Sequence, residues 1–202
     1  MKTRALTTLS IALLCAMPAS AADFSDPTWP CIQRKVEALS PGLMWPVAIE
    51  NPDLTPDVEA EVQDLVGYLT LRRLPLEEVQ PRLDDFTAAH GTDPALIGHV
   101  FERAFTRLNS LRGRIIKGIG EYSLGQIDLA ARIDAARSEM SAEMAKEAPD
   151  YDHVDKLEEQ IDWDERIYTD RRTSLTYVCE TPVLLEKRLF AIAQMLQAEL
   201  PQ

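Results

Sequence analysis

Two cysteines, Cys31 and Cys179, are the side chains of this sequence with the most predictable chemistry. The chain has no C-x-x-C pair, which argues against thioredoxin-type redox chemistry, and no C-x-x-C-H, which argues against covalent haem attachment. Cys15, the third cysteine, falls in the N-terminal segment that we predict below to be removed. The remaining pair, in an oxidising compartment, predicts a disulfide. We therefore expect Cys31 to be bonded to Cys179, with two free thiols or a redox pair as the alternative.

Two methionines and a histidine form the second candidate site. Met140 and Met144 are one helical turn apart, and His153 follows a predicted turn that brings it back beside them. Thioether and imidazole ligands together suit Cu(I), so Met140, Met144 and His153 form a candidate metal site. The competing interpretation, which the pattern favours, is that the methionines fill an apolar core.

A basic run in an otherwise acidic chain is the third candidate. Arg103, Arg107 and Arg114 share one face of a predicted helix and could form an interface with an anionic partner. The interpretation we favour is that these arginines neutralise carboxylates between residues 57 and 64, or are solvated.

Known catalytic and nucleotide-binding motifs are missing from the sequence. It contains no G-x-S-x-G, no P-loop, no G-x-G-x-x-G and none of the E-x-x-H pairs that build di-iron bundles. The three histidines stand alone. We therefore expect a protein without enzymatic activity and without a cofactor.

The N-terminus has the three parts of a secretory signal peptide. Lys2 and Arg4 precede an apolar run too short to span a membrane, and Ala19-Ser20-Ala21 forms an A-x-A cleavage site. We predict that residues 1–21 are removed and that the mature chain is periplasmic or secreted. No later stretch is long and apolar enough for a transmembrane segment.

Charge limits the partners of the mature chain. Removing Lys2 and Arg4 leaves 19 basic and 33 acidic residues, a net charge of −14. Such a chain repels nucleic acid and anionic lipid, so we expect neither as a partner.

Proline separates a first segment, residues 22–54, from the rest. Its prolines exclude a long helix, but its tryptophans and aliphatic residues are too numerous for a disordered tail. We expect an extended wrap on the main body, pinned by the disulfide, with Trp29 or Trp45 packed on the bundle and one short helix near 31–39.

Helical periodicity dominates residues 55–202, which we predict to be one all-α domain, an antiparallel helical bundle or long helical hairpin. The predicted helices are 55–74, 76–90, 94–147, 152–179 and 182–200. Folding the chain at Pro149-Asp150 places residue i opposite residue 299 − i. The break at Cys179–Pro182 then meets the glycines of Gly118–Gly125, so we expect both arms to bend there and the glycines to admit the Cys31 segment.

Long helices with few polar site groups favour an exported, non-enzymatic module that binds another exported protein as an adaptor, chaperone or assembly factor. The alternative is a carrier of a metal, such as copper, or of a small ligand at the hairpin tip. An enzyme is the third and least favoured class.

Overall fold

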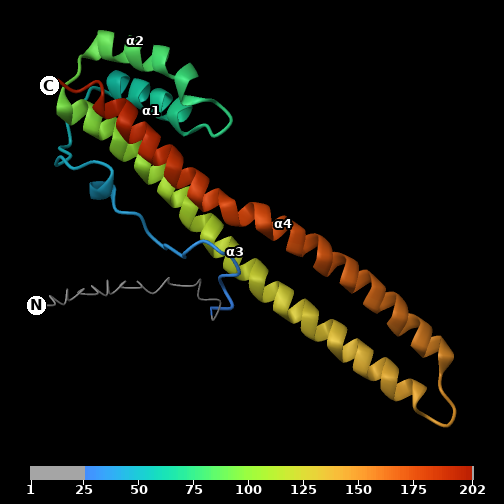
Figure 1. Cartoon of the computed structure of the whole chain (residues 1–202). Coiled ribbons are helices and arrows are strands. Elements are labelled where there is room, and N and C mark those ends of the chain that lie inside the picture. Colours follow the sequence, from blue (N-terminus) through green and yellow to red (C-terminus); the bar gives the residue numbers. More distant parts are fainter. Residues whose placement is uncertain (1–25, 202) are drawn as a thin grey trace, which may run out of the picture.

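The computed structural model describes residues 26–201, so the predicted signal peptide, residues 1–21, lies outside the described residues. The elements are η1 (Pro41–Leu43), α1 (Pro56–Thr70), η2 (Leu76–Glu78), α2 (Gln80–His90), α3 (Pro94–Met144) and α4 (Tyr151–Gln197). The two long helices α3 and α4 form an antiparallel hairpin, and α1 and α2 lie at its open end (Figure 1). The all-α prediction is confirmed. Within residues 26–201, no helix combines the length and apolar character that crossing a membrane requires.

Local capping signals set the boundaries of the first helices. The Thr55 hydroxyl accepts the Val58 amide at the start of α1, and the Asp93 carboxylate accepts the Ala95 amide at the start of α3. Gly91 ends α2 with φ 80°, a conformation that favours glycine. Pro81 lies in the first turn of α2, where a proline is tolerated, so the helix starts later than the predicted residue 76.

The hairpin tip is closed by acidic side chains. Asp150 caps α4 by accepting the amide of His153 at 3.2 Å. The buried Glu143 carboxylate accepts the Asp150 amide at 3.1 Å and pairs with Lys146. These contacts, first with Lys146 and then with the Asp150 backbone, lower the pKa of Glu143. The predicted turn at Pro149-Asp150 is confirmed.

The predicted break in the second arm, at Cys179–Pro182, is wrong. α3 runs without interruption through Gly118–Gly125, and α4 contains Pro182 in its interior, so helices 152–179 and 182–200 are one helix. A proline inside a helix removes one backbone hydrogen bond and costs about 3 kcal/mol. Here Pro182 is buried, as are Cys179 and Leu185, and the helix continues through it along α3.

The register of the hairpin agrees with the predicted fold-back. Arg112 lies opposite Glu186, one residue from its predicted partner, and Arg132 pairs with Asp164 at 3.2 Å, three residues from the predicted one. The main apolar core lies at the end covered by α1 and α2, around Phe101, whereas smaller clusters surround the disulfide and line the distal arm.

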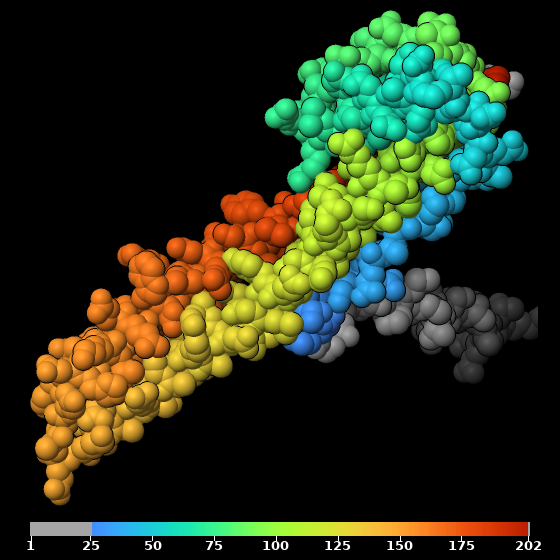
Figure 2. All heavy atoms as spheres, turned by 180° about the vertical axis from the view of Figure 1, so that it is seen from behind, coloured from blue at the N-terminus to red at the C-terminus, as the bar shows by residue number. Residues whose placement is uncertain are grey.

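The proline-rich segment, residues 26–54, runs along α3 in the opposite direction (Figure 2). The Ser123 hydroxyl donates to the Pro27 carbonyl at 2.7 Å, and Trp45 stacks on Phe101 with ring centroids 4.8 Å apart. Trp29 and Trp45 are both buried, as predicted. The helix predicted near 31–39 is absent, because the carbonyl of Gln33 accepts the Trp29 indole instead of a helical amide.

Gly120 and Gly118 differ in their surroundings. A Cβ at Gly120 would lie 3.4 Å from Thr28, whereas one at Gly118 would meet nothing within 4 Å. The wrap therefore passes within van der Waals reach of α3 at Gly120, whereas the expectation that glycine admits it is wrong at Gly118 and Gly125.

Substituting these two glycines should give different results. Gly118→Ala should raise the free energy of unfolding by about 0.5–1 kcal/mol, because alanine loses less conformational entropy in a helix. Gly120→Ala should gain less, since its methyl group would lie at the limit of van der Waals contact with Thr28. Urea unfolding of both variants measures the difference, and equal stabilisation would show that the wrap does not pack closely on α3.

Candidate functional site

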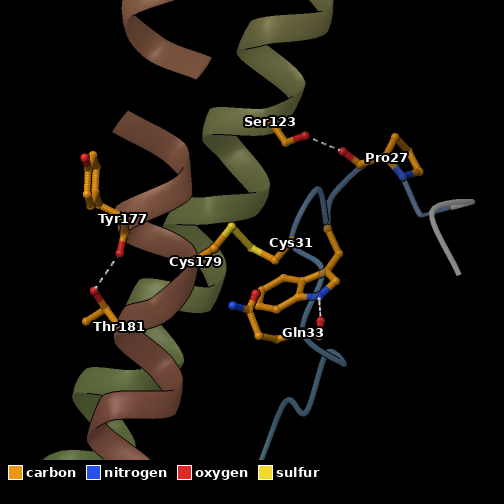
Figure 3. The surroundings of a disulfide bond; sticks show 8 residues. Pro27, Cys31, Gln33, Ser123, Tyr177, Cys179 and Thr181 are labelled. Atoms are coloured by element: carbon orange, nitrogen blue, oxygen red, sulfur yellow. Dashed lines mark hydrogen bonds between the residues drawn. A yellow bond between two sulfur atoms is a disulfide. The ribbon is translucent and has the colours of Figure 1, made fainter. Parts of the chain in front are cut away.

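The disulfide ties the wrap to α4. Cys31 and Cys179 are bonded with their Cα atoms 5.5 Å apart, which confirms the predicted pair (Figure 3). Both cysteines are buried and pack with Trp29, Ile116 and Ile119. The bond thus joins the wrap to α4, and the apolar cluster around it includes α3 residues about halfway along that helix.

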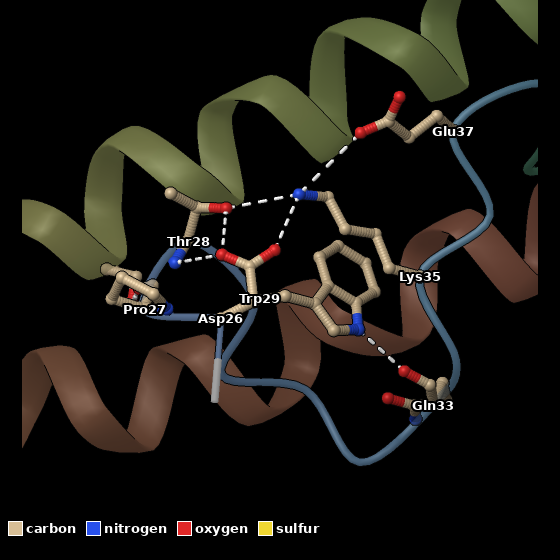
Figure 4. A network of polar contacts seen from close by, with 8 residues as sticks. Asp26, Pro27, Thr28, Trp29, Gln33, Lys35 and Glu37 are labelled. Atoms are coloured by element: carbon tan, nitrogen blue, oxygen red, sulfur yellow. Dashed lines mark hydrogen bonds and ion pairs between the residues drawn. The ribbon is translucent and has the colours of Figure 1, made fainter. Parts of the chain in front are cut away.

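A small polar network anchors the first turn of the wrap (Figure 4). The Asp26 carboxylate accepts the backbone amide of Thr28 at 2.8 Å, its hydroxyl at 2.6 Å and the Lys35 ammonium at 2.9 Å. These hydrogen bonds, the one from the Thr28 hydroxyl foremost, lower the pKa of Asp26 to about 2. The carboxylate thus holds the chain on both sides of Trp29.

This network predicts a pH dependence. Because the folded-state pKa of Asp26 is below the value near 4 of an unfolded chain, its contribution to stability is complete above about pH 4 and is lost as the pH falls towards 2. Asp26→Asn should therefore lower the urea midpoint at pH 5 and have little effect near pH 2. A difference of equal size at both pH values would contradict the role of the carboxylate charge.

A cleft of about 510 Å³ lies beside the disulfide, between the wrap, α3 and α4. This volume is in the range of small-molecule and peptide-side-chain sites. Its walls are mainly apolar and include Ile32 from the wrap, Ile127 and Ala130 from α3, and Leu175 from α4. Ile32 and Ile127 are exposed, so the apolar surface is open to a ligand.

Polar side chains from the wrap, α3 and α4 also line this cleft. The Gln126 amide nitrogen donates to the Tyr168 carbonyl at 3.1 Å, which fixes the orientation of the amide and leaves its oxygen without a donor among the described residues. The buried amide oxygen of Gln33, on the wrap, also has no donor there. Arg172 and Glu180 stand at the exposed edge of the cleft on α4.

No motif in the sequence predicts this cleft. The available signal was the polarity of Ser123 and Gln126, which occupy buried positions on the inner face of α3. Their polarity marks a stretch where the two arms are not joined by a continuous apolar core.

The three candidate metal ligands at the tip have different surroundings. Met140 packs against the apolar cluster of the distal arm, Met144 is half exposed, and His153 Nε2 lies 2.9 Å from a carboxylate oxygen of Glu139. Residues 26–201 contain no group of three histidine, cysteine or acidic side chains that could hold a metal ion. Copper binding by the thioethers stays a prediction.

The three arginines of the predicted basic face have different surroundings. Arg103 pairs with Glu59 of α1 at 2.7 Å, and His99 lies 2.9 Å from the same carboxylate. Contacts with Gln63, His99 and Arg103 lower the pKa of Glu59. Arg107 and Arg114 are exposed and form no ion pair with the described residues. Neutralisation by α1 thus accounts for one of the three.

Arg112, between these exposed arginines, is buried instead. Its side chain is 4% exposed, and its Nη2 lies 3.9 Å from the Glu186 carboxylate, too far for a hydrogen bond. Nε and Nη1 have no partner within residues 26–201. Burial, partly offset by Glu186, lowers the pKa of the guanidinium.

The outer face of α4 carries exposed apolar side chains at regular positions. Trp163 is 62% exposed, Tyr177 is 71% exposed and Leu184 is 49% exposed. They are fourteen and seven residues apart, so they follow one side of a helix in a two-stranded pair. No described segment covers this side of α4.

No protein-family model, curated protein or solved structure matches the chain. The class that the fold and these sites define is an all-α hairpin to which a proline-rich wrap is joined by a disulfide.

Proposed function

We propose that the chain is an exported, non-enzymatic helical protein that binds another exported protein as an adaptor, chaperone or assembly factor. The observation that carries this proposal is the line of exposed side chains on the outer face of α4, Trp163, Tyr177 and Leu184. Tryptophan and tyrosine are enriched in protein interfaces because they bury much area at little conformational cost. A partner surface that covers them would remove three large apolar groups from water.

Two features support export. The sequence begins with the pattern of a signal peptide, and the pair of cysteines in the predicted mature chain forms a disulfide, a bond that persists in oxidising compartments. The net charge of −14 expected for the mature chain favours a partner with a basic surface and disfavours nucleic acid.

Site-specific photo-cross-linking in an exporting bacterial host tests the proposal. A photoreactive amino acid at position 177 or 184 should give one discrete adduct with a second exported protein. The same amino acid at position 43, where Leu43 of the wrap is also exposed, serves as the matched control. Adducts of identical pattern at all three positions, or none at 177 and 184, would contradict the proposal.

A further inference from the structure

We infer that the cleft beside the disulfide binds the C-terminus of a protein chain that ends in an apolar residue. This inference rests on the proposed function only in taking a protein as the occupant, since the cleft is separate from the outer face of α4. Its basis is the combination of an apolar cleft, a cation at its edge and buried acceptors without donors.

The cation is Arg172. Its side chain is exposed at the edge of the cleft and forms no ion pair with the described residues. A guanidinium binds a carboxylate through two parallel hydrogen bonds, which makes a terminal carboxylate a complementary ligand. Glu180, at the disulfide end of the same cleft, repels an anion and so directs the carboxylate towards Arg172.

The unpartnered acceptor is the amide oxygen of Gln126. The Gln126 side chain is 8% exposed, and its nitrogen is held by the carbonyl of Tyr168, one helical turn before Arg172. A buried acceptor without a donor is unfavourable, so a ligand that supplies an N–H is favoured over one that cannot. A peptide C-terminus has a backbone N–H next to its carboxylate, whereas a fatty acid has none.

Length and apolar character also fit a short peptide. The cleft follows α4 from Tyr168 to Glu180, about 18 Å of helix. Five residues of extended chain span about 17 Å. The amide oxygen of Gln33 on the wrap is a second acceptor for backbone N–H groups, and Ile127 and Leu175 provide the surface for an apolar side chain.

Fluorescence polarisation with labelled pentapeptides tests the inference. The set ends in Leu, Val, Ile or Phe, each with a free carboxylate and again as the C-terminal amide. At least one free-acid peptide should bind, and its amide should bind at least about tenfold more weakly, because the charged hydrogen bonds are lost. Arg172→Gln should cause a similar loss and Gln126→Leu a loss of about tenfold. Arg166→Gln, an exposed arginine elsewhere on α4, should have no effect.

Three results would overturn the inference: no binding by any free-acid peptide, equal binding by acids and amides, or full displacement of the peptide by decanoate with the same dependence on Gln126. A variant with Trp163→Ser and Tyr177→Ser separates the two proposals. This variant should lose the cross-linked partner but retain peptide binding in the cleft. Conversely, Arg172→Gln should lose peptide binding but retain the cross-linked partner.

Discussion

Removal of the disulfide by Cys31→Ser with Cys179→Ser is expected to lower the free energy of unfolding by several kcal/mol. The bond links residues 148 positions apart. For a loop of this length the chain-entropy model gives a stabilisation of about 5 kcal/mol, and native disulfides in small proteins contribute about 2–5 kcal/mol. Urea unfolding of the oxidised protein and of the variant measures this difference.

The variant should also show where the stability is lost. The wrap has few backbone hydrogen bonds of its own, so it should separate from the hairpin while α3 and α4 retain their helical circular dichroism. Fluorescence should shift to longer wavelength as buried Trp29 meets water.

Reductant provides the control for this experiment. It should reproduce the loss in the native protein and leave the double variant unchanged. A native protein whose unfolding midpoint does not respond to reductant would contradict the pinning role of the bond, as would free thiols in the oxidised sample.

Replacement of the buried Arg112 should change stability in the opposite direction. Arg112→Met is expected to raise the free energy of unfolding by about 1–4 kcal/mol, the range found when buried ion pairs are replaced by apolar residues, because the remaining Glu186 carboxylate is half exposed and is not left as a buried charge. The physical reason is that the guanidinium is 4% exposed, lacks partners for Nε and Nη1, and lies 3.9 Å from Glu186. Methionine fills the space without a charge to desolvate.

Glu186→Gln and Arg114→Met are the matched comparisons. Glu186→Gln should destabilise the protein, because it removes the carboxylate that partly compensates the buried cation. Arg114→Met, at an exposed position of the same helix, should change the unfolding free energy by less than about 0.5 kcal/mol. Destabilisation by Arg112→Met would instead show that the buried guanidinium makes a net favourable contribution to the hairpin.

The sequence predicted those features that depend on neighbouring residues. Thr55-Pro56, His90-Gly91 and Pro149-Asp150 mark helix ends correctly, because caps and turns use side chains and backbone angles within a few positions. The disulfide was also predictable, since removal of the expected signal peptide leaves only one possible pair of cysteines. Apolar periodicity was sufficient for the all-α class and the approximate register of the hairpin.

Tertiary packing decided the features that local signals predicted wrongly or missed. Proline disfavours the interior of an isolated helix, but α4, which packs along α3, continues through a buried Pro182. The segment 31–39 is extended because the Trp29 indole occupies a carbonyl that a helix would use. The cleft exists only in the assembled structure, because Gln33, Gln126 and Arg172 line it from the wrap, α3 and α4. The amide oxygen of Gln126 has no donor within the described part of this assembly. No spacing within a single helix encodes such a meeting, since each of these residues contributes to the site from a different element.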